Sequence, residues 1–467
     1  MNGDITNEER EEYLAYHSYN DFFENLENGL ENAQNECDRL EKKEPYILVC
    51  GAMIAFDKGL SNFLNVMNEK KGNLILLSEV TAENRRYTKN KIRFPFICTP
   101  HLLAKEMILL NMDIPITEEM EKLYSQKIYI QEAVSNLMAR HPSVCQSYAL
   151  AWSYYAFQYI NILLENIPLQ YVILWNKYYA FHEIFDGICK EKKIRVFYME
   201  FGCIPGTISI ERFGQQGESI WAHKYTKWLK NRILRSELIY SQNVIKYLKQ
   251  SGLNRNIQPS PLFDTETLKI LKNGKKNVLY IGQNDYESGL FPYTSKTRKK
   301  HSKSFKSTIE GLDFLYELCQ KNDWNLLYKP HPIIESLKTE EESYSGYTDL
   351  HVLRNVNINH IIDHVDVVVT ILSQTAYVSL IREKPVVMLG YTQLRNKGCC
   401  YEAYDKCKVE SGIKKALRFG ITRRQKKNFR VHVAILLKYY LWDDECTKEC
   451  IIGREISKVD CGKEFIK

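Results

Sequence analysis

Three segments in the second half of the chain decide its fold: Asn325-Leu-Leu-Tyr-Lys-Pro-His-Pro332, Asp366-Val-Val-Val-Thr-Ile-Leu-Ser-Gln-Thr375 and Lys384-Pro-Val-Val-Met-Leu-Gly390. Each is a short apolar run that ends in polar residues. Such runs are typical of buried parallel strands, and α/β proteins carry their ligand sites at the carboxyl ends of those strands. The sequence therefore predicts an α/β domain with a catalytic or ligand-binding site at one edge of its sheet.

The last two segments predict one strand–helix–strand unit, with strands at residues 367–370 and 385–389 and a helix at 374–383. Ser373 and Thr375 fall where this helix begins. Their hydroxyls and the free backbone N–H groups of the first helical turn face one point, which is how α/β proteins hold phosphate. The unit therefore predicts a phosphate site.

Further donors are needed, because a helix dipole contributes only ~0.3–1 kcal/mol per charge. Lys329 and His331 follow the strand around residues 326–328, so we expect them at the same sheet edge. The alternative is purely structural, with Ser373 as a helix cap and His331 as a buried loop histidine.

Composition indicates an ordinary folded protein of two or three domains, with 467 residues of which 44% are hydrophobic. The 13 cysteines are odd in number and form no CxxC pair, which favours a reduced, cytoplasmic compartment over a disulfide framework or a zinc site. The polar, acidic start is unlike a secretory signal, and the longest apolar run is about eleven residues, against the ~20 that a membrane span needs. We therefore expect a cytoplasmic protein that is either soluble or peripheral. A peripheral protein would contact the inner face of the cell membrane.

Basic residues concentrate in two runs, Lys296–Lys306 and Lys414–Arg430. The second precedes the aromatic, amphipathic stretch Val431–Trp442, a pattern compatible with contact to an anionic membrane surface. The first could attract an anionic acceptor. A solvated surface explains either run equally simply, and no nucleic-acid reading motif accompanies them, so nucleic acid is not expected as a partner.

Further strands are predicted in the first half of the chain, so the fold class is α/β, with two Rossmann-like domains facing a cleft, an N-terminal helical extension and a C-terminal helix. The predicted strands are Tyr46–Cys50, Asn73–Leu77, Tyr171–Trp175, Ile194–Met199 and Asn277–Gly282. The expected units are a helical extension (1–44), a first α/β domain (45–225) with a helical insertion near 116–165, a connector (226–271), a second α/β domain (272–420) and a basic, aromatic helix with its tail (421–467).

Two more polar segments follow predicted strands. The segment Glu200–Gly214 reads as a loop with a carboxylate, Glu200, placed to act as general base toward an acceptor hydroxyl. The segment Gly282–Gly289 offers amide, carboxylate and hydroxyl groups at Gln283, Asp285 and Ser288. Ordinary turn chemistry is the alternative for both.

Taken in order, these motifs resemble those of the bacterial capsule polysaccharide biosynthesis family, which includes the Kdo transferases of capsule assembly and is similar to bacterial sialyltransferases of GT-B fold. The resemblance covers about Tyr171 to Gly390. It is carried by Glu200-x-Gly202 with Pro205-Gly-Thr and Glu211-x-x-Gly214, then Gly282-Gln-x-Asp285-x-x-Ser288, Lys329-x-His331-Pro332, Ser373-x-Thr375 and Lys384-Pro385.

The resemblance implies an inverting glycosyltransferase that moves an acidic sugar, Kdo-like or sialic-acid-like, from a CMP-sugar donor to a glycan or lipid-linked glycan acceptor. The first α/β domain would lie on the acceptor side and the second would bind the nucleotide sugar. No cofactor and no obligatory divalent ion are implied. The implied roles are Glu200 and His331 in catalysis, Gly202 and Glu211 in support of the acceptor loop, and Lys329, His331, Pro332, Ser373, Thr375, Gln283, Asp285 and Ser288 in nucleotide and phosphate binding.

One position departs from the family pattern, because relatives often carry a second acid where this chain has Phe201. Glu200 must then act as the base, with Asp57 and Glu211 in reserve, and loss of catalysis would turn the chain into a capsule-assembly scaffold that binds a lipid-linked glycan. A second alternative is a CDP-glycerol-type polyol phosphotransferase, since those enzymes share the Lys-x-His-Pro element and a serine-rich phosphate loop.

Overall fold

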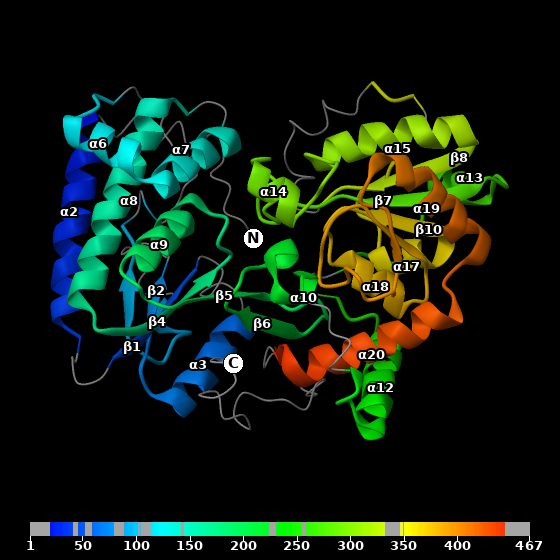
Figure 1. Cartoon of the computed structure of the whole chain (residues 1–467), viewed down its shortest axis with the longest axis horizontal. Helices are drawn as coiled ribbons and strands as arrows, with labels where there is room; N and C mark the ends of the chain where they lie inside the picture. Colours follow the sequence, from blue (N-terminus) through cyan, green and yellow to red (C-terminus); the bar gives the residue numbers. More distant parts are fainter. Residues whose placement is uncertain are drawn as a thin grey trace.

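The chain forms two α/β layers side by side (Figure 1). The computed structural model describes residues 19–443 except 41–44, 52–57, 79–87, 101–102, 104–113, 142–143, 224–229, 255–257, 332–345 and 349. Pro332 and Asp57, singled out from the sequence, lie outside the described residues.

The first sheet has the strand order β13-β6-β5-β4-β1-β2-β3, and its strands are parallel except β6, which is antiparallel to both of its neighbours, β5 and β13. Alternate residues of each strand face opposite sides: Leu48 and Leu174 pack into one core, and Val49 and Ile173 into the other. Both sides are buried, which is why the strands read as continuous apolar runs. The bounds are β1 Tyr46–Cys50, β2 Leu74–Ser78, β3 Phe96–Cys98, β4 Leu169–Trp175, β5 Val196–Phe201, β6 Thr207–Glu211 and β13 Leu441–Asp443.

Helices cover both faces of this sheet. The helical insertion predicted near 116–165 is present as three helices that pack, with α2 and α9, on one face, and each fully buried Leu or Phe there contributes ~1.5–3 kcal/mol. Helix α3 covers the other face through Leu60, Phe63 and Met67. The bounds are α2 Tyr19–Asp38, α3 Lys58–Lys71, α6 Glu118–Gln126, α7 Ile128–Arg140, α8 Gln146–Asn166 and α9 Ala180–Glu191.

The second sheet is parallel throughout its described strands, in the order β12-β11-β10-β7-β8-β9. The predicted strand–helix–strand unit is confirmed as β10, α18 and β11, although the helix is shorter than expected at both ends. The strands are β7 Lys276–Ile281, β8 Trp324–Lys329, β9 His351–Val352, β10 Val367–Thr370, β11 Val386–Met388 and β12 Tyr401–Glu402, and the helices that follow them in the chain are α14 Ser295–Lys300, α15 Thr308–Asn322, α17 Ile358–His364, α18 Thr375–Ile381 and α19 Lys406–Phe419.

The segment 200–214, predicted to be a loop, is instead mostly a β-hairpin of β5 and β6. Thr207 to Glu211 alternates polar residues with isoleucine, and this pattern fits a strand better than a turn. The prediction was wrong because the glycines and the proline of this segment, which mark the hairpin connection at 202–206, were read as a long loop.

The two layers are joined twice. The chain crosses from β6 through η3 Gln216–Glu218, α10 Ile220–His223, α12 Arg235–Ser251 and α13 Thr265–Lys272 to the second sheet. It returns through α20 Arg423–Tyr439 to the first sheet, where it ends in β13, a strand that the sequence did not predict. The fold class predicted from the sequence is confirmed: an α/β chain with two layers of Rossmann-like strand order.

The basic C-terminal helix packs inward. Phe429, Val433 and Leu436 of α20 are buried in a core shared with Tyr377 of α18, so the apolar face of this helix is covered by protein. Among the residues that the structure describes, no helix is long and apolar enough to cross a membrane.

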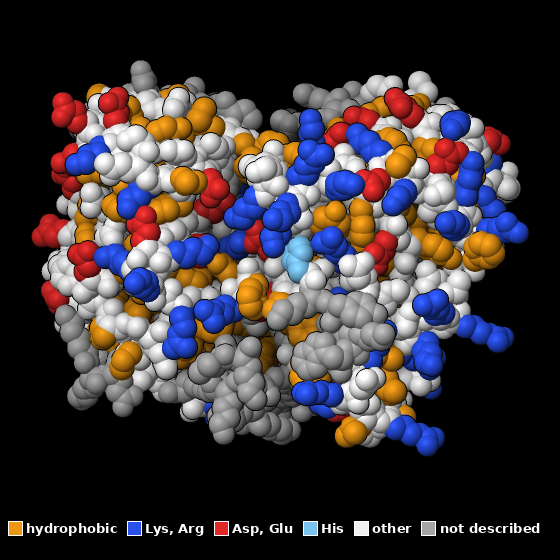
Figure 2. Space-filling view, in the orientation of Figure 1, with side chains coloured by type: hydrophobic (Ala, Val, Ile, Leu, Met, Phe, Trp, Pro, Cys, Tyr) orange, Lys and Arg blue, Asp and Glu red, His pale blue; other side chains and the backbone are white. Residues whose placement is uncertain are grey.

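The other basic run lies at the junction of the two layers. Figure 2 shows Lys and Arg side chains gathered where α14 lies in Figure 1. Lys296 reaches to 3.8 Å from the buried carboxylate of Glu218, and Lys303 pairs with Asp405 at 2.5 Å. These two charges of the run therefore have protein partners.

Candidate active site

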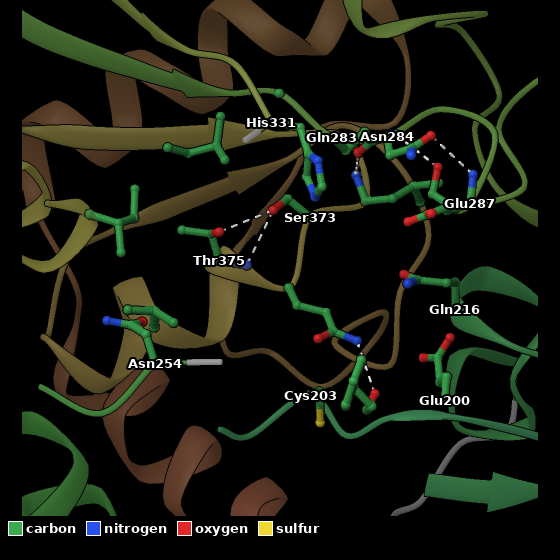
Figure 3. A pocket seen from close by; sticks show the side chains of 18 of the residues that line it. Glu200, Cys203, Gln216, Asn254, Gln283, Asn284, Glu287, His331, Ser373 and Thr375 are labelled. Atoms are coloured by element: carbon green, nitrogen blue, oxygen red, sulfur yellow. Dashed lines mark hydrogen bonds between the residues drawn. The ribbon is translucent and has the colours of Figure 1, made fainter. Parts of the chain in front are cut away.

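A cavity of about 280 Å³ lies between the two layers, at the carboxyl ends of β4 and β5 on one side and of β7, β8 and β10 on the other. Figure 3 shows Ser373 and Thr375 near its middle, with Glu200, Gln216 and Glu287 to one side and Asn254 to the other. Eight of the predicted site residues line it: Glu200, Gly202, Gln283, Ser288, Lys329, His331, Ser373 and Thr375.

Lys329 and His331 come from the end of β8. Lys329 is its last residue and is 8% exposed, so the ammonium group sits in a site largely closed to solvent, where an anion gains more from a cation than it would at the surface. His331 follows two residues later and lines the cavity. The expectation that both side chains reach one edge with Ser373 and Thr375 is confirmed by the positions of all four in the lining.

Ser373 and Thr375 form a hydroxyl pair. The hydroxyl of Ser373 donates to Thr375 Oγ1 at 3.1 Å and accepts from the backbone N–H of Thr375 at 3.3 Å, while Ser373 N–H donates to Thr370 Oγ1. The residue that caps α18 is Gln374, so Ser373 precedes the cap rather than providing it. Two hydroxyls and the loop that orients them therefore face the cavity.

Gln283 is a buried bridge rather than an exposed ligand group. Its Oε1 accepts from the N–H of Leu372 at 2.7 Å, and its Nε2 donates to Asp285 at 3.3 Å and to Ser288 at 3.4 Å. It thereby ties the turn after β7 to the loop that carries Ser373. This arrangement fixes the position of the hydroxyl pair.

Asp285 does not line the cavity, in contrast to its predicted place among the nucleotide-binding residues. Its carboxylate accepts from both the N–H and the hydroxyl of Thr308 at 2.6 Å, at the start of α15. Burial raises its pKa to about 6, although the bonds from Thr308 and Gln283 lower it. The sequence placed it in the right turn but could not show that the side chain points inward.

Glu200 lies on β5 and lines the cavity, with its side chain on the same side as Gln216 (Figure 3). The next residue, Phe201, packs edge-on against Trp175 with ring centroids 4.8 Å apart, and both also line the cavity. The position where relatives carry a second acid is therefore part of an aromatic wall. Glu200 is the carboxylate that β5 presents to the site.

Gly202 is required by the hairpin. A Cβ there would lie 1.9 Å from Thr207 Oγ1 and 2.8 Å from Leu441, and its N–H donates to the carbonyl of Thr207 at 2.7 Å. The close approach of β13 and the return strand leaves no room for a side chain.

Glu211, the reserve candidate for the base, is buried on β6 and does not line the cavity. Its Oε2 accepts from the N–H of Ile220 at 3.1 Å. Burial raises its pKa to about 8, although Ser219, Ile220 and Lys177 lower it. Glu211 thus supports the segment 216–223 and has no access to a substrate.

Several lining residues were missed by sequence reasoning. Trp175, Asn176 and Tyr179 lie at or just after the end of β4, and the rule that sites follow strand ends could have found them. Asn176 and Gln216 line the cavity with left-handed backbones, φ 46° and 49°, a feature that clusters at functional sites.

Other missed residues differ in the signal that they carry. Glu287 lies in the segment Gly282–Gly289 singled out from the sequence, and it accepts from the hydroxyl of Tyr179 at 2.9 Å, across the two layers. Asn254 and Gln258 come from the segment between α12 and α13, where no strand end marks them. Among the described residues, no group of three or more His, Cys, Asp or Glu side chains is arranged to hold a metal ion.

Comparison with solved structures finds distant matches. A beta-Kdo 2,7 transferase of KpsC from Thermosulfurimonas dismutans is 18% identical, with 60% of this chain and 79% of that chain covered and a TM-score of 0.36. The beta-Kdo 2,4 transferase of the same organism's KpsC is 13% identical, with 57% of this chain and 79% of that chain covered and a TM-score of 0.40. The UDP-GlcNAc 2-epimerase of Methanocaldococcus jannaschii is 9% identical, with 83% of this chain and 97% of that chain covered and a TM-score of 0.35. No curated protein matches the chain.

The comparison with protein families gives one assignment. Residues 214–408 match the model described as capsule polysaccharide biosynthesis protein. This span contains the second sheet with Gln283, Lys329, His331, Ser373 and Thr375, whereas Glu200 and Gly202 precede it. The resemblance seen in the sequence is confirmed over residues 214–408, which are similar to the capsule polysaccharide biosynthesis family.

Proposed function

We propose that the protein is a glycosyltransferase of capsule or surface polysaccharide biosynthesis. It transfers an acidic sugar, Kdo-like or sialic-acid-like, from a CMP-sugar to a glycan or lipid-linked glycan, with inversion at the anomeric carbon. One observation carries the proposal: a single cavity brings the ammonium group of Lys329, the imidazole of His331 and the hydroxyls of Ser373 and Thr375 together with the carboxylate of Glu200.

The phosphate of CMP fits the side of the cavity made by the second sheet. Lys329 neutralises its charge, His331 contacts it, and the hydroxyl of Thr375, which accepts from Ser373 at 3.1 Å, donates to its oxygens. As the bond between the anomeric carbon and the phosphate oxygen breaks, negative charge grows on the phosphate. Donors that are already fixed, as Thr375 is by Ser373, stabilise this charge without reorganising.

Glu200 serves the other partner of the reaction. It takes the proton of the acceptor hydroxyl as that oxygen attacks the anomeric carbon, on the face opposite the departing phosphate. A general base so placed contributes ~10²–10⁴-fold to the rate. Its position at the end of β5, opposite the phosphate side, is what single-step inversion requires.

An acidic donor sugar brings a carboxylate of its own. That group is disfavoured beside Glu200 and Glu287 and favoured beside Lys329, because like charges repel and opposite charges attract strongly around the buried Lys329. The donor carboxylate is therefore directed toward the second sheet, on the same side as the phosphate. Removing Lys329 should weaken an acidic donor more than CMP alone.

The proposed place of action is the cytoplasm, at the inner face of the membrane where a lipid-linked acceptor is held. Because the apolar face of α20 is buried, contact with anionic lipid would use exposed cations such as Arg423, Arg424 and Lys427. Co-sedimentation with phosphatidylglycerol vesicles, compared with phosphatidylcholine vesicles, tests this contact.

The deciding experiment is calorimetric titration of the purified protein with CMP, UDP and GDP in EDTA. Selective CMP binding that is lost in His331→Ala supports the proposal. A preference for UDP or GDP would refute the CMP donor, and no binding at all would favour a non-catalytic scaffold. The mass of the reaction product then separates sugar transfer from polyol phosphate transfer, since phosphate is retained in the second product.

A further inference from the structure

The two ends of the cavity differ in chemistry on either side of Ser373 and Thr375. In Figure 3, Glu200 and Gln216 lie on one side of this hydroxyl pair and Asn254 lies on the other. The first end is acidic and hydroxyl-binding in character, with Glu200, Glu287 and the hydroxyl of Tyr179. At the second end, hydrogen bonds link Asn254, Gln258 and the start of α17 at Ile358, and Val378 lies on α18, which packs against α17; all four residues line the cavity.

The second end is held by backbone hydrogen bonds. Gln258 Oε1 accepts from the N–H of Ile358, the first residue of α17, at 3.0 Å. Asn254 Nδ2 donates to the carbonyl of Gly252 at 3.1 Å, and the same carbonyl accepts from Asn359 of α17 at 2.8 Å. The two amides and α17 are thus linked into one assembly, in which Ile358 contributes an apolar surface.

We propose that this second end, made by Asn254, Gln258, Ile358 and Val378, seats the pyrimidine base of the nucleotide, which leaves the Glu200 end for the transferred sugar and the acceptor. The assignment rests on the proposed function, because it takes the phosphate to lie at Ser373 and Thr375. A nucleotide sugar runs from base through ribose and phosphate to sugar. A phosphate fixed in the middle of the cavity therefore sends the base and the sugar to opposite ends.

The chemistry of each end decides the direction. The flat faces of a base are apolar and match Ile358 and Val378, while its edge needs both donors and acceptors. A carboxamide supplies one of each, and cytosine presents an amino donor next to a ring-nitrogen acceptor. The other end also offers an amide, that of Gln216, but it holds Glu200, the carboxylate that an attacking hydroxyl requires, so the sugar and the acceptor belong there. Asn254 and Gln258 are therefore specificity-determining residues for the base.

The test compares CMP with ribose 5-phosphate, which has the same sugar and phosphate but no base. Titration of Asn254→Ala and Gln258→Ala should show CMP affinity lowered about tenfold for each lost amide, the effect of one hydrogen bond. Ribose 5-phosphate affinity should stay as in the wild type. Gln216→Ala removes an amide of the same kind from the other end and should leave both affinities unchanged. Asn254→Asp keeps the shape of the side chain and checks that loss of affinity is not loss of folding.

The outcomes are separable. If CMP affinity is unchanged in Asn254→Ala and Gln258→Ala but falls in Gln216→Ala, the base lies at the Glu200 end. That result would overturn the assignment of the base while leaving the proposed function intact. Equal affinity of the wild type for CMP and ribose 5-phosphate would also overturn it, since no base would then be seated. Failure of the wild type to bind any nucleotide would overturn the proposed function and this assignment together.

Discussion

The side-chain amide of Gln374 donates a hydrogen bond of 3.2 Å to the backbone carbonyl of Phe201. The donor caps α18 of the second layer and the acceptor ends β5 of the first, so this bond joins the two layers at the wall of the cavity. Because Gln374 stands between Ser373 and Thr375, the bond couples the hydroxyl pair to the hairpin that carries Glu200.

Replacing Gln374 with Ala should therefore affect both stability and ligand binding. Loss of one hydrogen bond costs about 0.5–1.5 kcal/mol of unfolding free energy, and CMP affinity should fall about two- to tenfold because the hydroxyl pair is less well fixed. Denaturant unfolding and calorimetry measure the two effects. Gln131→Ala is a matched control. Gln131 lies on α7, which contributes no residue to the cavity lining, and its side-chain amide donates to the carbonyl of Tyr124 at 2.8 Å. It should lose stability alone, and an equal loss of CMP affinity in both variants would contradict the coupling.

The two carboxylates of the cavity should separate by function. Glu200→Gln should lower the rate of transfer ~10²–10⁴-fold while CMP affinity stays unchanged, because a base is removed and the shape is kept. Glu287→Gln should lower the rate of transfer less than Glu200→Gln does. Tyr179→Phe removes the hydroxyl that donates to Glu287, and it should also lower the rate less than Glu200→Gln does. Initial rates with the acidic CMP-sugar donor measure this. The reverse ranking of the two glutamine variants would make Glu287 the base.

A buried ion pair holds the loop after β4 to the segment that leaves β6. Lys177 and Glu218 are 7% and 6% exposed and are in direct contact, and Lys296 and His301 of the second layer approach the same carboxylate at 3.8 and 3.9 Å. Burial by itself would raise the pKa of Glu218, but Lys177, His301 and Lys296 together hold it well below its ordinary value. The carboxylate is thus charged in the folded protein.

Lys177→Met should cost ~3–5 kcal/mol of unfolding free energy, because it leaves that charge buried without its nearest cation. The double variant Lys177→Met/Glu218→Gln should recover part of the loss, since the buried charge is then removed as well. Lys414→Met breaks an exposed pair with Glu410 on α19 and should leave the free energy of unfolding nearly unchanged, because solvent screens that pair. A double variant as unstable as the sum of its single changes would show that the buried pair is not coupled.

Glu211 should make stability depend on pH. Its pKa is raised from the ordinary 4.5 to about 8, chiefly by burial, so the folded chain holds a proton that the unfolded chain has lost over this interval. The stability that it contributes is full below pH 4.5 and is lost as pH rises toward 8.

Glu211→Gln keeps the neutral shape and should flatten that pH dependence. At pH 8.5 the variant should be more stable than the wild type by a few kcal/mol, because each pH unit between the folded and unfolded pKa values of a group corresponds to about 1.4 kcal/mol. Chemical denaturation at pH 5.0 and 8.5 measures it. Glu31→Gln on the exposed side of α2 should change neither value. Burial raises the pKa of Glu183 to about 7, so a smaller dependence of stability on pH, of the same sign, remains in the variant. If the dependence of unfolding free energy on pH is the same in Glu211→Gln as in the wild type, the prediction is contradicted.

The wall of the cavity made by the second sheet could be predicted because its information is local. Strands β7, β8 and β10 are apolar runs, and the residues that follow them, Gln283, Lys329, His331 and Ser373, reach one sheet edge by the geometry of parallel strands. The inward turn of Asp285 could not be predicted, because its partner Thr308 lies 23 residues away in another element.

The sequence by itself thus determined two α/β layers, most of their strands and the chemistry at the strand ends, since hydrophobic periodicity and turn residues act over a few neighbours. The tertiary structure alone decided the hairpin of β5 and β6, the return of β13 and the contacts across the cavity. Gln374 and Phe201 are 173 residues apart, and Asn254 lies in a connector with no periodic signal. Such contacts depend on how two finished layers pack, which no local pattern encodes, so the hairpin behind Glu200 and the end of the cavity at Asn254 became visible only in the folded molecule.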